Sequence, residues 1–152
     1  MMADYNLKDR SGPWVHFLDQ QKAHLPVVTD KLGITIKIDG KDMKNLDSLF
    51  ARYAEIFRFP SYFGGNWPAF NECITDLSDL PAKAYLTIIT EADCVLQSEP
   101  AELPTFIKHL QIAGHSWANS FGKGPEWGSG EVPFNTVFSG NQGPLFTLLQ
   151  HF

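Results

Sequence analysis

The sequence has few cysteines, no long apolar run and no leader-like start. Its two cysteines, Cys73 and Cys94, lack CxxC spacing and predict small buried side chains in a reducing compartment, with a single disulfide left open as the alternative. The longest apolar runs cover only a few residues, too few for a membrane span. The first residues show no basic stretch followed by an apolar core. We therefore expect a cytoplasmic protein with no membrane partner.

The sequence also lacks the signatures of metal sites and common enzymes. Its five histidines show no metal-ligand spacing, and neither an HExxH nor a GxSxG motif occurs. The glycine-rich stretch from Gly122 to Gly130 has no Lys-Ser/Thr ending, so it predicts a flexible connection and not a phosphate loop. Trp127 within it could touch a partner or fold back as a cover. No catalytic residue, metal or cofactor is expected, and the sequence does not support an enzyme.

Negative charge is concentrated in residues 72–102. The formal net charge is −5, and residues 72–102 hold seven acids against one base, Lys83. Such a segment repels nucleic acid and attracts basic surfaces. We therefore expect a basic protein partner and no nucleic acid. At 152 residues the chain is long enough for one domain with a hydrophobic core.

Hydrophobic periodicity predicts strands separated by helices. This order favours a parallel α/β sheet with right-handed crossovers. Residues 14–18 fit an extra strand or a helical turn, and residues 145–152 fit an edge strand or a short helix. The predicted strands are Ile34–Ile38, Tyr85–Thr90 and Pro133–Phe138, and the predicted helices run from Leu46 to Phe57, from Trp67 to Leu77 and from Ala101 to Trp117.

The most informative stretch is an aromatic and glycine loop that leads directly into an amphipathic helix. Asn66 can cap this helix, with Pro68 tolerated in its first turn. Its apolar stripe includes Trp67, Phe70 and Ile74, and the opposite face carries Pro68, Glu72, Thr75 and Asp76. Gly64-Gly65 predicts a turn with positive φ. The loop aromatics Tyr62 and Phe63 suit either a core lid or a partner contact, and the acids suit either a solvated face or a binding surface.

The run Pro60-Ser61-Tyr62-Phe63-Gly64-Gly65-Asn66-Trp67, with Glu72 six residues after Asn66 and then Cys73-Ile74-Thr75, resembles the barstar family of ribonuclease inhibitors. The similarity extends over about residues 34–139, which leaves 1–33 and 140–152 as extensions of a single domain, 1–152. The resemblance implies a small three-layer α/β domain with a three-stranded parallel sheet flanked by helices. It also implies a one-to-one complex with a basic ribonuclease of the extracellular or toxin type.

In that family the loop and the following helix plug the active site of the nuclease. The resemblance places Tyr62 near the catalytic histidine of the partner and Glu72 in a phosphate subsite. The inhibitor would serve as an immunity protein or antitoxin. The predicted partner-binding residues are Tyr62, Phe63, Gly64, Gly65, Asn66, Pro68, Asn71, Glu72, Thr75 and Asp76.

The sequence departs from the family pattern at two places on this helix. Pro68 stands where the best-known member carries a second acid, and Asn71 replaces an aromatic. Asp76 could restore some of the lost charge, so we expect a conserved interface site with a different partner. Two alternatives stay open. One is a binding module of the same fold with a basic partner that is no nuclease, and the other is a small α/β enzyme or nucleotide-binding domain, which only the fold class supports.

Overall fold

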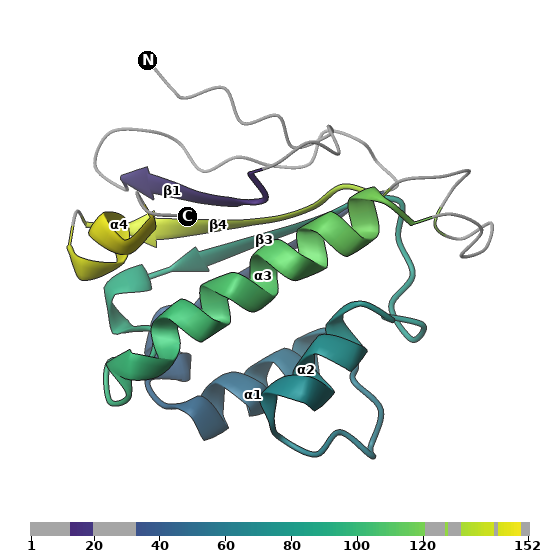
Figure 1. Ribbon diagram of the computed structural model, residues 1–152, viewed down its shortest axis with the longest axis horizontal. Helices are drawn as coiled ribbons and strands as arrows, with labels where there is room; N and C mark the ends of the chain where they lie inside the picture. Colours follow the sequence, from purple (N-terminus) through teal and green to yellow (C-terminus); the bar gives the residue numbers. More distant parts are fainter. Residues whose placement is uncertain (1–12, 20–32, 121–126, 128–131, 142, 150–152) are drawn as a thin grey trace.

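The computed structural model describes residues 13–19, 33–120, 127, 132–141 and 143–149. Within these residues four strands form one fully parallel sheet in the order β1-β4-β3-β2 (Figure 1). The strands are β1 (Val15–Asp19), β2 (Ile34–Asp39), β3 (Tyr85–Thr90) and β4 (Phe134–Gly140). The predicted parallel α/β class is confirmed.

The sheet has one strand more than the sequence predicted. The added strand is β1, in the N-terminal extension, and it pairs in parallel with β4 from Val15↔Thr136 to Asp19↔Gly140. Residues 14–18 are therefore extended and not a helical turn. Beside the strand, Trp14 packs so closely on Gly114 that a Cβ at that position would overlap the indole. With a neighbour on each edge, β4 is buried along its whole length.

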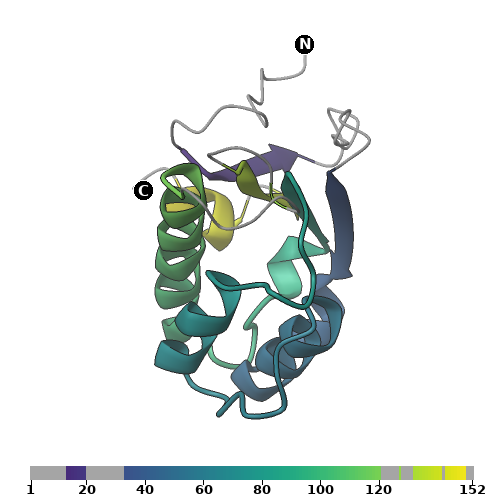
Figure 2. The same ribbon diagram turned by 90° about the vertical axis from the view of Figure 1, so that its right-hand side faces the viewer.

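The described helices contribute side chains to one core on one face of the sheet (Figures 1 and 2). The predicted third layer is not seen among the described residues. The C-terminal stretch forms a short helix up to Leu149 and not an edge strand, with 150–152 outside the described part. No described helix is long and apolar enough to cross a membrane. The helices are α1 (Leu46–Ile56), α2 (Trp67–Ile74), α3 (Leu103–Ala118) and α4 (Pro144–Leu149), with 3₁₀ turns at Gly40–Met43, Ala92–Cys94 and Pro100–Glu102.

The centre of the core face carries two adjacent threonines. Thr87 and Thr136 are register partners on β3 and β4, between the large side chains that face the helices. They are 0% and 1% exposed, and neither hydroxyl has a hydrogen-bond partner in the part of the chain that the structure describes. A buried hydroxyl without a partner loses its hydration without compensation. This pair is therefore a weak point in an otherwise apolar core.

Trp127 is the one residue of the glycine-rich stretch that lies in the described part of the chain. Its ring stacks on Trp117 with centroids 6.4 Å apart, and its Nε1 donates to the Tyr85 hydroxyl at 3.1 Å. Tyr85 in turn donates to the Leu80 carbonyl at 2.6 Å, and burial raises its pKa to about 12. Trp127 therefore folds back onto Trp117 and Tyr85 and covers them, which is the second of the two roles considered for it.

Candidate functional site

The loop between α1 and α2 is fixed by its own backbone. Arg58 adopts a left-handed conformation (φ 57°) and turns the chain away from α1. The Phe59 N–H then donates to the Ala54 carbonyl at 2.9 Å, and the Phe63 N–H donates to the Pro60 carbonyl at 3.0 Å. Of the two predicted glycines, only Gly65 has a positive φ, at 68°. These bonds give the loop a defined shape instead of leaving it free.

The two loop aromatics point to different environments. Tyr62 is 72% exposed, the most exposed large side chain among the described apolar and aromatic residues. Phe63 is half-buried and lies edge-on against Phe50 and Phe59, at ring-centroid distances of 5.7 and 5.1 Å. Phe63 thus anchors the loop to the core, which leaves Tyr62 as the ring presented to solvent.

Helix α2 begins as predicted and ends earlier than predicted. The Asn66 side chain accepts a hydrogen bond from the Ala69 N–H at 2.8 Å, and Pro68 lies in the first turn. The helix stops at Ile74 with Thr75 as its C-cap, and Leu77 is left-handed (φ 48°). Asp76 is therefore in a turn, and the expectation that it shares a helical face with Glu72 is wrong.

Three exposed carboxylates nevertheless act on the Tyr62 hydroxyl through their charge. Glu72, Asp76 and Asp79 are exposed. Asp76 also holds its own turn together, because its Oδ2 accepts from the Ser78 N–H at 3.2 Å and from the Ser78 hydroxyl. Local desolvation, and then the negative charges of Cys73, Glu72, Asp76 and Asp79, raise the pKa of the Tyr62 hydroxyl. The aromatic and the acids therefore form one surface, which we call the Tyr62–Glu72 surface: Tyr62, Glu72, Asp76 and Asp79.

The other predicted interface residues differ in whether their side chains are exposed or half-buried. Asn71 is half-buried, and its Oδ1 is buried and finds no hydrogen-bond partner among the residues that the structure describes. Thr75 is also half-buried and donates its hydroxyl to the Asn71 carbonyl at 2.7 Å. These two side chains support the helix end more than they face solvent. The exposed members of the predicted set are Tyr62, Gly64, Gly65, Asn66, Pro68, Glu72 and Asp76.

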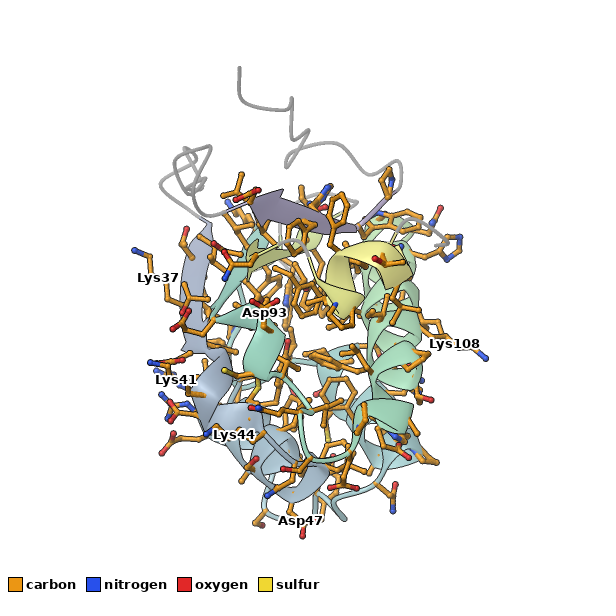
Figure 3. All side chains as sticks on the ribbon, turned by 90° about the vertical axis from the view of Figure 1, so that its left-hand side faces the viewer. Lys37, Lys41, Lys44, Asp47, Asp93 and Lys108 are labelled. Atoms are coloured by element: carbon orange, nitrogen blue, oxygen red, sulfur yellow. The ribbon has the colours of Figure 1, made fainter. Side chains whose placement is uncertain are left out.

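The acidic segment 72–102 does not form one patch in space. Its last two acids accept hydrogen bonds within the fold, Glu99 from the Leu46 N–H at 2.9 Å and Glu102 from the Trp67 Nε1 at 2.8 Å. Glu91 pairs with Lys41 at 3.4 Å. Asp93 lies on the 3₁₀ turn that follows β3 (Figure 3), and its Oδ2 accepts from the Asn141 N–H at 3.3 Å. Only the first three acids of the segment belong to the Tyr62–Glu72 surface.

Two contacts with α3 hold α2 in place, and neither has a signal in the sequence. At the start of the helix, Trp67 bonds Glu102 and stacks on His109 with centroids 5.0 Å apart. At its end, the buried Nε1 of Trp117 donates to the Ile74 carbonyl at 2.9 Å. Because both ends are tied to a longer helix, Glu72 sits on a rigid frame. The supporting residues Glu102, His109 and Trp117 were not in the predicted site.

The cysteines and the sheet edge offer no catalytic chemistry to this surface. Cys73 and Cys94 are free thiols, and burial, followed by the charges of Glu72 and Asp76, raises the pKa of Cys73. No group of three metal-binding side chains occurs within the described residues. At the carboxyl ends of the strands lies a cavity of about 210 Å³. Its lining is mainly apolar, which does not suit a nucleotide phosphate.

Comparison with known proteins places this geometry in a family. The family described as Barstar (barnase inhibitor) matches residues 34–136, more than half of the chain, which includes the loop, α2, the strands β2 and β3 and the start of β4. No curated protein matches the sequence. Members of the matching family are inhibitors of ribonucleases and not enzymes. The extent of the match shows that this chain belongs to the barstar family.

Proposed function

We propose that this protein inhibits a small basic ribonuclease in a one-to-one complex, with the loop and α2 blocking the active site of the nuclease. The partner is of the extracellular or toxin type, and the role is that of an immunity protein or antitoxin in the cytoplasm. The whole chain, 1–152, acts as one domain. The family match supports a ribonuclease as the class of partner.

The observation that carries the proposal is the joint exposure of Tyr62 and Glu72 on a fixed frame. An exposed aromatic ring beside carboxylates resembles the anchor and charged contacts of tight protein interfaces. The frame matters because side chains that are already ordered lose little entropy on binding. Tyr62 is 72% exposed although Phe63, its neighbour, is anchored to the core.

The mechanism requires no bond to be made or broken. A ribonuclease holds phosphates with arginine, lysine and histidine side chains, and a carboxylate can occupy the same positions through charge-assisted hydrogen bonds. Glu72 presents such a carboxylate from a rigid helix, and Asp76 and Asp79 extend the negative field around Tyr62. Opposite fields also speed association in low salt. Inhibition is then steric, since the carboxylates offer no scissile phosphate.

The test is titration of ribonuclease activity with wild-type protein and with Glu72→Gln and Tyr62→Ala. Barnase, named in the family description, and small basic ribonucleases from the source organism serve as probes. Asp47→Asn is the matched control, because it removes one exposed carboxylate at the opposite end of α1. We expect inhibition by the wild type and the control, with large losses in the two surface variants. Unchanged inhibition in both surface variants would show that the interface is assigned wrongly.

A second candidate is a binding module for a basic protein that is not a nuclease. The feature that favours it is the start of α2, which carries Pro68 and no acid in its first turn. This helix therefore offers the partner fewer carboxylates than the family pattern does. It would fill fewer of the phosphate subsites of a nuclease. A partner that binds the Tyr62–Glu72 surface and cleaves no RNA would favour this reading.

A further inference from the structure

The first residue of α2 makes a close contact with α3 at the junction between the loop and the helix. The Trp67 indole lies parallel to the His109 imidazole, with 6° between the ring planes and 5.0 Å between centroids. Its Nε1 donates to Glu102 Oε1 at 2.8 Å. Trp67 directly follows the helix cap Asn66, so it joins the loop that carries Tyr62 to the helix that carries Glu72. Any shift of this indole moves both halves of the surface.

The surroundings of His109 disfavour its charged form. Its Nδ1 is buried and has no hydrogen-bond partner among the described residues. The aromatic rings of Trp67 and Phe70 pack against the imidazole, at 5.0 and 6.2 Å between centroids. Burial, and then the like charge of Lys108, lower the pKa of His109.

The charged groups around His109 offer it little compensation. Lys108 adjoins it on α3 and points away from the core (Figure 3). Glu102, on the turn before α3, is engaged by the Trp67 indole. From α2, Asn71 lies one turn after Trp67 and adds an uncharged amide. An imidazolium at this position would therefore be held in a packed aromatic contact while the like charge of Lys108 disfavours it.

We propose that Trp67 is the positioning residue of the Tyr62–Glu72 surface, and that protonation of His109 loosens its contact and weakens partner binding in acid. The effect on partner binding rests on the proposed function. A charged imidazole regains hydration if the first turn of α2 moves away from α3. The end of the helix stays tied through Trp117 and the Ile74 carbonyl. The movement therefore affects the loop and the first turn while the rest of the core stays packed.

The first test uses the protein alone. Hydrogen exchange of the amides of Phe70, Asn71 and Glu72, which bond the carbonyls of the first turn of α2, is measured at pH about 5 and about 7.5, on either side of the ordinary histidine pKa, and corrected for intrinsic exchange rates. We expect protection in the wild type to fall severalfold in acid. His109→Phe keeps an aromatic ring without a titrating group, and His109→Gln serves as a second variant if the first folds poorly. Both should show the same protection at the two pH values.

The control is His115→Gln, which removes an exposed histidine from the same helix at its contact with Trp14. This variant should keep the wild-type response. If wild-type protection is the same at both pH values, or if the two His109 variants respond to acid as the wild type does, the proposal is overturned.

The second test measures binding of barnase at the same two pH values. The ratio of the wild-type dissociation constant to that of His109→Phe cancels titration of the nuclease itself. We expect this ratio to rise several-fold in acid, and a constant ratio would contradict the proposal. Absence of any ribonuclease binding at neutral pH would instead count against the proposed function, whatever the exchange experiment shows.

Discussion

The left-handed glycine of the loop gives a prediction with a built-in control. Gly65 has a φ of 68°, and a Cβ added there would meet no atom within 4 Å. Replacement by alanine therefore changes the backbone energy without a steric clash. A residue with a Cβ costs about 1–2 kcal/mol in this conformation, and the reduced entropy of the unfolded chain offsets about 0.4–1 kcal/mol of it. We expect Gly65→Ala to lower the free energy of unfolding by about 1 kcal/mol.

The neighbouring Gly64 is the matched control. Its φ is not positive, and an added Cβ would lie 3.5 Å from the Asn66 Nδ2, an ordinary contact. Gly64→Ala should then be neutral or slightly stabilising. Urea unfolding of both variants, followed by tryptophan fluorescence, measures the difference directly. Equal midpoints for the two variants, or a more stable Gly65→Ala, would refute the backbone argument and the loop conformation it assumes.

Three further predictions follow from burial and charge. Tyr62→Ala should leave stability unchanged, whereas Phe63→Ala should cost about 1–3 kcal/mol by urea unfolding, and equal costs would contradict their assigned environments. Thr87→Val and Thr136→Val should each raise the free energy of unfolding by about 1 kcal/mol, because each removes a buried hydroxyl without a partner. A decrease would show that these hydroxyls are satisfied. Burial lowers the pKa of His16, against the hydrogen bond that its Nε2 donates to Asn135 Oδ1, and burial also lowers the pKa of His109. As pH falls through about 6.5 the unfolded chain protonates first, so stability should fall below that pH and be flat above it. A double replacement of these histidines should remove the slope in urea unfolding, and a persistent slope would contradict the assignment.

Local features of the fold could be predicted because they depend on neighbouring residues. The bounds of β3 match the predicted strand Tyr85–Thr90, since a run of apolar and β-branched residues suits a strand buried on both faces. Asn66 caps α2 as predicted. Asn45 caps α1 through a reciprocal pair of hydrogen bonds with Ser48, three residues further along the chain. All of these need only the adjacent sequence.

Other features depend on contacts between distant segments. The strand β1 pairs with β4, more than one hundred residues further along the chain. Because this partner is distant, the short sequence of β1 alone fits both a strand and a helical turn. The early end of α2 depends on the left-handed Leu77, a residue type that does not favour this conformation. For the site, the family resemblance placed Tyr62 and Glu72 at the interface, and both side chains are exposed. It did not predict that Asp79 joins them or that Trp67 and Trp117 fix the helix.

The central claim is most directly tested by capture of ribonuclease activity. Wild-type protein, the double variant Tyr62→Ala/Glu72→Gln and the Asp47→Asn control are immobilised and loaded at low salt with lysate and culture medium of the source organism. A salt step then elutes bound protein for a ribonuclease assay. The account predicts that the wild type and the control retain a small basic ribonuclease that is silent until released, and that the double variant does not. Equal retention by all three columns, or a basic partner without ribonuclease activity, would contradict it.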